Sequence, residues 1–281
     1  VNIETCYSLR PGARYIEIDT TLHNLGFEQL GVYMTEYLNG SGQVEFFQPY
    51  AGFGEPTLTP SCPLDTWVTC DSEFGGSCDQ CNYAAYTGVD GAAGVSYGLI
   101  HEEKESSSFS TAGINILVYG ASVLELILLA PEPEYQIPAG GELLFKRYFA
   151  VGDGTVASIA DIRNELFGIE AAEISGSVSS GGQPLEGAQV AAYQVLDAQS
   201  SPPTLFMANH SRTDDAGNYR MSLPPGEYEV RANMEGYPFP AAGPGILSVA
   251  AAPIVQNFDM PQPGYLDVTV IDHVGPGAAK V

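Results

Sequence analysis

The sequence is short of positive charge. Among its 281 residues, 10 are Lys or Arg and 34 are Asp or Glu, so the formal net charge is −24. Nucleic acids and anionic membrane surfaces are bound through clusters of basic side chains, and this composition supplies none. We therefore expect neither as a partner. The acidic residues are scattered, which predicts a heavily hydrated surface, with cation binding as the alternative.

The chain also lacks the features of a membrane protein. No stretch reaches the roughly eighteen consecutive apolar residues that a membrane-spanning helix needs, so we expect no membrane insertion. No signal peptide opens the chain, and any targeting segment is expected to have been removed or to lie upstream.

Motifs that carry catalysis are missing as well. There is no GxSxG, P-loop or dinucleotide-binding fingerprint. The four histidines (His23, His101, His210 and His273) lie far apart and form no HxH or HExxH pattern. The best local cluster is His101-Glu102-Glu103, but it follows an apolar strand and starts a charged run, which favours a solvated strand end. We assign no catalytic residue, no cofactor and no strong metal site.

What the sequence does contain indicates an all-β protein. It has 32 Gly and 20 Pro, spread between short alternating segments. Residues 14–24 alternate apolar and polar side chains, as a half-buried strand does. Further strands are predicted at 31–38, 44–48, 95–101, 114–119, 123–129 and 143–151, whereas 49–94 reads as one long loop.

One helix is predicted over 155–167. Apolar residues at 156, 159, 162 and 166 have helical spacing. Asp153 or Thr155 is suited to cap its start, and Gly168 its end. We expect this helix to close a first domain and to lead into a linker.

Four of the five cysteines fall within the predicted loop, at Cys62, Cys70, Cys78 and Cys81. Two disulfides that staple the loop are favoured over a tetrathiolate metal site, because only Cys78 and Cys81 have the close CxxC spacing of a zinc ribbon. Three pairings remain open, of which the nested one avoids a tight ring between Cys78 and Cys81. Cys6 is left over.

Aromatic residues crowd the same region. Exposed rings beside carboxylates stack on sugars, whereas buried rings would pack the loop onto the sheet. The candidates for glycan or protein binding are Phe53, Trp67, Asp71, Tyr83 and Tyr86.

The segment after the helix shows strands separated by ordered turns, with a loop predicted between a strand at 188–196 and His210. These include Pro184-Leu185-x-Gly187-Ala188, Thr213-Asp214-x-x-Gly217-x-Tyr219 and Leu223-Pro224-Pro225-Gly226-x-Tyr228. The pattern resembles the carboxypeptidase regulatory-like domain. That resemblance implies a small transthyretin-like antiparallel β-sandwich without catalytic activity. Asp214, Asp215 and Asn218 are weak calcium candidates, because the same residues form an ordinary turn.

The first segment resembles, more loosely, the β-supersandwich domains of the galactose-mutarotase-like class. The residues concerned are 11–26, from Pro11-Gly12-x-Arg14-Tyr15, and 147–154, from Arg147-Tyr148-Phe149. Such a pairing resembles the arrangement ahead of PHP-type metallohydrolase domains. We find no His/Glu pair that would make an active mutarotase.

The last residues repeat the start of the second segment. Residues 264–281 carry an alternating strand with Leu266, Val268 and Val270, a Gly/Pro turn and a small-Ala-x-Val ending, as residues 172–190 do. This is either the start of a further β module or an assembly strand that adds to the sheet edge of a neighbour.

Together these observations predict three units. A β-supersandwich with a Cys-rich loop spans 1–168, a carboxypeptidase regulatory-like β-sandwich spans 169–262, and a partial module spans 263–281. The expected function is that of a structural or accessory segment of a secreted or cell-surface protein (periplasmic is a further option). Its expected partners are other domains, further copies or glycans. The alternatives are the N-terminal region of a metallohydrolase and a fibre subunit that assembles by strand donation.

Overall fold

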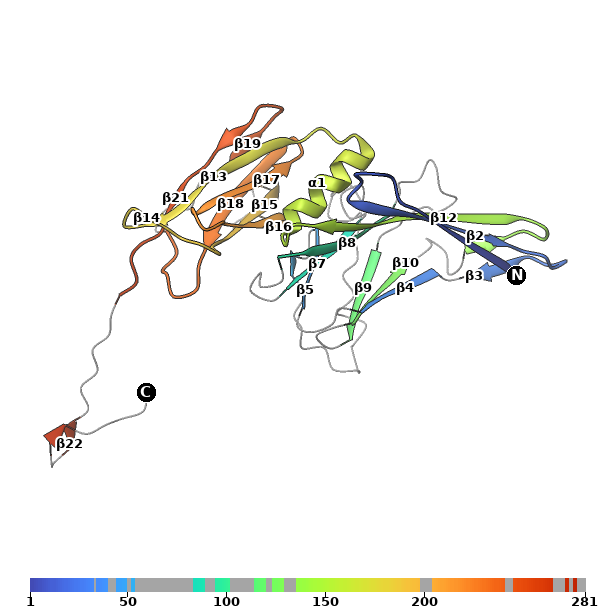
Figure 1. Ribbon diagram of the computed structural model, residues 1–281, viewed down its shortest axis with the longest axis horizontal. Helices are drawn as coiled ribbons and strands as arrows, with labels where there is room; N and C mark the ends of the chain where they lie inside the picture. The colour runs from blue at the N-terminus through green and yellow to red at the C-terminus, as the bar shows by residue number, and fades with distance from the viewer. Residues whose placement is uncertain are drawn as a thin grey trace.

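The structure is a computed structural model, and it is all-β with one helix (Figure 1). It describes residues 1–32, 34–39, 44–49, 52–53, 83–88, 94–101, 114–119, 123–128, 135–197, 204–240, 245–264, 271–272 and 275–276. Strands gather in two groups, one before and one after the helix. Among the described residues, no helix is long and apolar enough to span a membrane.

Before the helix, the main feature is a seven-stranded sheet in the order β1-β2-β12-β8-β7-β5-β6. Its strands are β1 (Asn2–Ser8), β2 (Tyr15–His23), β12 (Glu142–Gly152), β8 (Ser96–His101), β7 (Tyr83–Gly88), β5 (Val44–Gln48) and β6 (Gly52–Phe53). Two smaller sheets join β4 (Met34–Asn39), β10 (Val123–Leu128) and β9 (Ile114–Tyr119), and β11 (Tyr135–Ile137) with β3 (Leu30–Val32). We call strands β1 to β12 the N-terminal sheets.

The position of β7 corrects the prediction of one long loop over 49–94. Strand β7 pairs with β5 and β8 in the middle of the large sheet. Five of its six residues are buried, on both faces of the sheet, so its sequence shows no apolar–polar alternation. The alternation of β2, in contrast, matched its observed range closely.

The helix, α1 (Val156–Phe167), forms where the sequence predicted it. The Thr155 hydroxyl caps its start by accepting a hydrogen bond from Ser158 N, and Gly168 ends it with φ 62° in the left-handed region. Residues 156–160 and 162–164 are buried, so the helix has little free surface.

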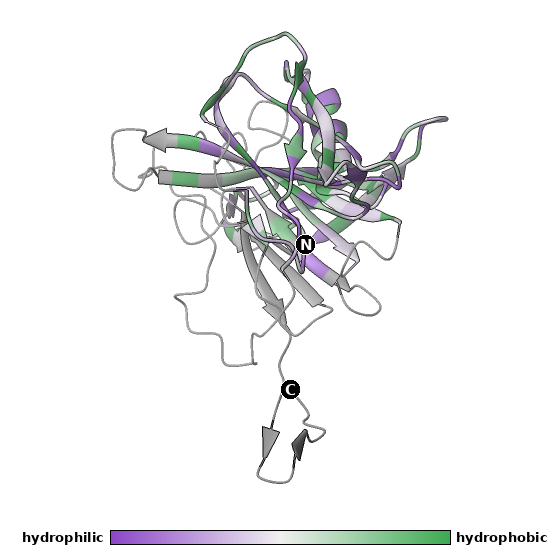
Figure 2. Ribbon diagram, turned by 90° about the vertical axis from the view of Figure 1, so that its left-hand side faces the viewer, coloured by the Kyte–Doolittle hydropathy of each residue, from purple (hydrophilic) through white to green (hydrophobic). Residues whose placement is uncertain are grey.

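After the helix, two sheets form the C-terminal sandwich. One contains β13 (Ala172–Ser180), β14 (Gln183–Pro184), β17 (Asn218–Leu223), β20 (Ile254–Val255) and β21 (Phe258–Asp259). The other has the order β16-β15-β18-β19, with β16 (Thr204–Arg212), β15 (Gln189–Asp197), β18 (Gly226–Asn233) and β19 (Leu247–Val249). The core between them includes Ile174, Val190, Tyr219, Tyr228 and Phe258. Hydrophobic and hydrophilic stretches mix along the strands in both groups (Figure 2).

Strand β16 was predicted as a loop, and the reason is its composition. Its end carries the consecutive polar residues Asn209, His210 and Ser211, all of which are nevertheless buried. Polar residues in series indicate a loop when only the sequence is known. Here they are buried because β16 lies where the sandwich meets the helix and the N-terminal sheets.

Within residues 265–281, the structure describes β22 (Ile271–Asp272) and β23 (Gly275–Pro276), which pair with each other. The assembly-strand candidates Leu266, Val268 and Val270 lie outside the described residues.

Candidate functional site

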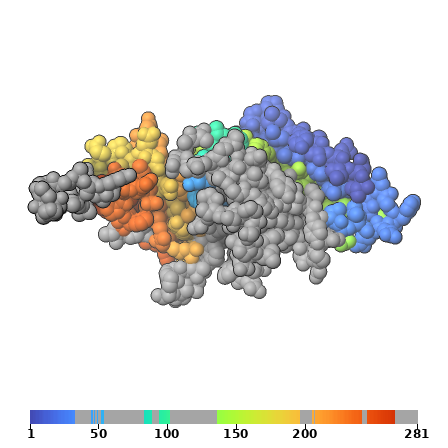
Figure 3. All heavy atoms as spheres, turned by 90° about the horizontal axis from the view of Figure 1, so that it is seen from below, coloured from blue at the N-terminus to red at the C-terminus, as the bar shows by residue number. Residues whose placement is uncertain are grey.

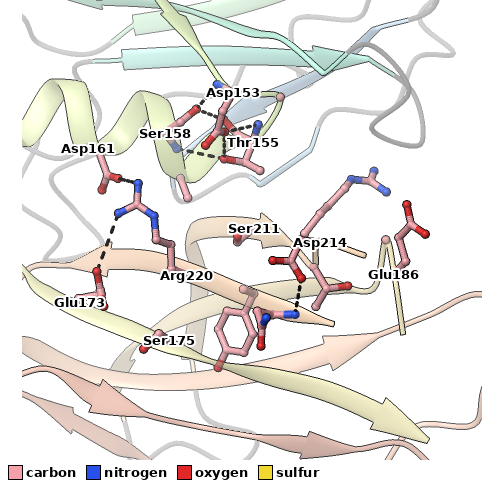
Figure 4. A pocket seen from close by; sticks show the side chains of 17 residues that line it. Asp153, Thr155, Ser158, Asp161, Glu173, Ser175, Glu186, Ser211, Asp214 and Arg220 are labelled. Carbon is pink, nitrogen blue, oxygen red and sulfur yellow. Dashed lines mark hydrogen bonds and ion pairs between the residues drawn. The ribbon is translucent and has the colours of Figure 1, made fainter. Parts of the chain in front are cut away.

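A cleft of about 660 Å³ lies between the start of α1 and the C-terminal sandwich (Figure 4). Its walls come from α1 and the turn before it, from β13, and from β16, β17 and the turns beside them. Five carboxylates and two guanidinium groups line it: Asp153, Asp161, Glu173, Glu186 and Asp214, with Arg212 and Arg220. The cleft is therefore predominantly acidic.

The hydroxyl groups on the helix side are bonded within the chain. Ser158 Oγ donates to the carbonyl oxygen of Thr155 (2.8 Å) and accepts from the backbone N–H of Asp153 (3.0 Å). The Asp153 carboxylate accepts hydrogen bonds from the backbone N–H and the hydroxyl of Thr155. Ser96 Oγ also donates to the Thr155 carbonyl, at 2.8 Å. These contacts fix the first turn of α1 on the large sheet.

Across the cleft, Arg220 reaches from β17 towards the helix. Its guanidinium lies 3.6 Å from Asp161 on α1 and 3.9 Å from Glu173 on β13, and Figure 4 shows the three side chains pointing toward one another. Burial raises the pKa of the Asp161 carboxyl, while the Ser222 hydroxyl and the guanidinium groups of Arg220 and Arg14 oppose that rise. The arrangement links the helix to the sandwich by charge.

On the sandwich side, Asp214 forms an Asx turn. Its Oδ1 accepts the backbone N–H groups of Ala216 (3.0 Å) and Asn218 (2.8 Å). These contacts favour the turn interpretation of the weak calcium candidates Asp214, Asp215 and Asn218. Across the part of the chain that the structure describes, no group of three or more His, Cys, Asp or Glu side chains could hold a metal ion.

The 17 residues that line the cleft include no histidine, cysteine or lysine. Ser158 therefore has no imidazole, thiolate or amine beside it within this lining to take its proton, as a serine nucleophile would need. Among the charged groups of this lining, the ion pair between Asp161 and Arg220 joins α1 to the sandwich.

The aromatic candidates that the structure describes belong to the protein core. Tyr83 is buried beside Phe47 and beneath α1, and burial raises the pKa of its hydroxyl well above the usual value. Tyr86 is also buried and lies 5.1 Å from the ring of Tyr97, between centroids. Phe53 meets the imidazole of His210 edge to face at 4.8 Å. These three rings lie on β6 and β7 of the large sheet itself, and not on a loop packed onto the sheet.

The remaining predicted residues of the loop are not described. Cys62, Cys70, Cys78 and Cys81 lie outside the described residues, as do Trp67 and Asp71. Cys6, on β1, is a free and exposed thiol.

His101 corrects another expectation. The residue that the sequence placed at a solvated strand end is 1% exposed. Its ring stacks on Phe145 at 5.5 Å, between centroids. Burial, with a smaller effect from Arg147, lowers its pKa to about 3. His210 is also buried, where β16 meets Phe53 of the N-terminal sheets, and its pKa is also about 3. No local pattern in the sequence indicates either environment, because both depend on residues far apart in the chain.

Comparison with known proteins identifies part of the chain. No curated protein sequence matches it. Among solved structures, one described as an aldose 1-epimerase from Klebsiella pneumoniae has 11% identity, a TM-score of 0.36 and coverage of 59% of this chain and 50% of its own. A TPR-domain containing protein from Parabacteroides distasonis has 13% identity, a TM-score of 0.31 and coverage of 56% and 31%. The chain thus spans half or less of these two proteins.

A pilus 2b backbone protein from group B streptococcus has 8% identity, a TM-score of 0.26 and coverage of 92% of this chain and 98% of its own. The family model of the carboxypeptidase regulatory-like domain matches residues 173–260, which correspond to strands β13 to β21. Residues 173–260 are therefore a carboxypeptidase regulatory-like domain, as the turn pattern of the sequence predicted.

Proposed function

We propose that this segment is a non-catalytic structural module of a secreted or cell-surface multidomain protein, in which α1 holds the N-terminal sheets and the C-terminal sandwich in one fixed orientation. The observation that carries the proposal is the burial of α1 from two sides. Ile159 and Ile162 belong to the core beneath the large sheet, whereas Ala157 belongs to the core of the sandwich. A helix shared by two cores resists separation of either one.

Direct contacts beside the helix support the same proposal. Met207 of β16 packs against the N-terminal core, next to Gly52 of β6. Arg212 of β16 reaches Glu45 of β5 at 3.4 Å, with its side chain only 13% exposed. A flexible linker would leave such surfaces hydrated, because domains joined loosely share few contacts.

The acidic cleft fits a structural role as well. Its ion pair between Asp161 and Arg220 connects α1 to the sandwich, and the capped start of α1 is bonded to the large sheet through Ser96. Connections of this kind hold a spacer rigid. A rigid spacer sets the distance and the orientation between whatever precedes it and whatever follows it in a longer protein.

The test is a comparison of alignment by NMR. Residual dipolar couplings from the N-terminal sheets and from the sandwich should fit one alignment tensor. Ala157→Arg places a charged side chain in the sandwich core beside the helix, and should leave both parts folded while requiring two tensors. Val255→Arg is the matched control, because Val255 is 72% exposed on the sandwich. Two independent tensors for the unmodified protein would refute the proposal.

A further inference from the structure

The large sheet ends in an open edge. Strand β1 is its first strand and pairs with β2 over seven consecutive residues without a register shift. Within the part of the chain that the structure describes, β1 has no partner on its other side. All seven residues of Asn2–Ser8 are exposed. Figure 3 shows these N-terminal residues, in dark blue, at the outer margin of the molecule.

One face of this edge is apolar. Side chains alternate along a strand, so residues 1, 3, 5, 7 and 9 project on the same side. Four of them are large and apolar and are more than half exposed: Val1 (62%), Ile3 (64%), Tyr7 (68%) and Leu9 (68%). The fifth, Thr5, contacts the Thr20 hydroxyl of β2 at 3.1 Å. An apolar row at a sheet edge is a surface that favours strand pairing.

The usual protections of an edge strand are missing from β1. Natural edges are guarded by Lys, Pro, bulges or inward-pointing charges. Residues 1–9 contain no Lys and no Pro, and Glu4 is their only charged side chain. The whole chain has a net charge of −24, so copies repel each other over most of their surface. Residues 1–9 themselves form a nearly uncharged strip on this acidic protein.

We propose that β1 is a homodimer interface, in which two copies pair their β1 strands antiparallel about a two-fold axis through Thr5. In that register Ile3 lies opposite Tyr7 of the second copy, and Val1 lies opposite its Leu9. Each apolar pair occurs twice, so the apolar row continues from one sheet into the other. Glu4 lies opposite Cys6, and the two Glu4 carboxylates never face each other. The strand is thus complementary to itself, as a two-fold interface requires.

Neighbouring registers are less favourable. An axis through Glu4 would place two carboxylates directly opposite each other, which destabilises a strand pair. An axis through Cys6 would pair the two Cys6 thiols but would leave Val1 without an apolar partner. In the proposed register the two Cys6 Cα atoms are about 8 Å apart, from two residues of rise and one strand spacing. That distance is too long for a disulfide.

The experiment is sedimentation velocity of the 281-residue chain over a concentration series at two salt concentrations. We expect the weight-average mass to rise from 29.8 kDa towards twice that value and to stop there. Raising salt from about 0.05 to about 0.5 M should strengthen dimerisation severalfold, because salt screens the repulsion between two anionic copies.

The decisive variant, Ile3→Lys with Tyr7→Lys, places two positive charges on the edge strand β1. It should weaken dimerisation at least tenfold. The control, Phe239→Lys with Val255→Lys, makes the same change of charge at residues that are 71% and 72% exposed on the C-terminal sandwich. It should dimerise like the unmodified protein. A chain that stays at 29.8 kDa at high concentration and high salt, or two variants that behave alike, would overturn the proposal.

A cross-link tests the register independently of those variants. Thr5→Cys in a Cys6→Ser background places the new thiols directly opposite each other across the axis, where mild oxidation should join the two copies through residue 5. The unmodified Cys6 should not form this bridge. A bridge through Cys6 instead would overturn the register. Growth of the mass beyond a dimer, abolished by deleting residues 265–281, would replace self-pairing with strand donation.

Discussion

The two buried histidines make the stability of this protein depend on pH in a way that can be calculated. His101 is 1% exposed and His210 is 4% exposed. Neither ring nitrogen of His101, nor Nε2 of His210, has a hydrogen-bond partner in the described part of the chain. Burial is the main cause of both lowered pKa values, and neighbouring arginines (Arg147 and Arg212) lower them further. Both imidazoles are therefore neutral in the folded protein.

The direction in which pH changes the stability follows from proton uptake on unfolding. Below the ordinary histidine pKa of 6.5 the unfolded chain binds a proton at each of these residues, whereas the folded protein does not until about pH 3. Acidification therefore favours unfolding, and the stability that the two neutral rings contribute is complete above pH 6.5 and is lost as the pH falls towards 3. Once the unfolded chain is protonated, each histidine lowers the free energy of unfolding by about 1.4 kcal/mol for every unit by which the pH falls. From about pH 7.5 to about pH 5 the two together lower the free energy of unfolding by about 4 kcal/mol.

Urea unfolding at fixed ionic strength, in steps of about half a pH unit over this window, measures the slope. His101→Gln and His210→Gln should each remove about half of it, and the double variant most of it. Met207→Leu is the control, because it changes the same contact region as His210 without removing a titratable group. It should lower stability slightly and leave the slope unchanged. A double variant with the full slope would refute the reasoning, since the proton uptake would then belong to other groups.

Three further predictions concern packing and can be checked by urea unfolding. Thr155→Ala should cost about 1 kcal/mol by removing the cap of α1, and Thr155→Ser should restore most of it. Gly98→Ala would bring a methyl group into collision with Ile159, so it should cost about 2 kcal/mol alone. Combined with Ile159→Ala, the loss should be smaller than the sum of the two by at least about 1 kcal/mol. Gly176→Ala would collide with the backbone carbonyl between β20 and β21 and should cost more than about 2 kcal/mol. The control Gly245→Ala, which meets nothing within 4 Å, should be neutral.

The parts of the fold that the sequence predicted correctly are those whose signals are local. The alternation of β2, the cap and spacing of α1, and the ordered turns of residues 173–260 are each set by neighbours in the chain. Strand β7 and strand β16 were assigned to loops for opposite reasons. The first is buried on both faces and so lacks alternation, and the second carries polar residues that are buried only where distant segments meet.

The candidate site shows the same division. The sequence predicted a turn at Asp214 and a cap at Asp153 or Thr155, because each is made within a few residues. It could not predict that Asp161 and Arg220 meet across a cleft, since 59 positions separate them along the chain and only the docking of α1 on the sandwich brings them together.

The buried polar residues at the end of β16, which the sequence assigned to a loop, bear on the proposed function. Asn209, His210 and Ser211 lie on the strand that contacts both α1 and the N-terminal sheets, where Phe53 covers the imidazole. A polar strand end is readily exposed to water in a sandwich that stands alone, but it becomes costly once another unit is packed over it. His210 is therefore expected to resist protonation only while the two units stay together. If the sandwich is expressed alone as residues 169–262, the NMR titration of His210 should move up towards 6.5. A titration that stays near pH 3 in the isolated sandwich would show that its own fold, and not the packing of the units, buries the ring.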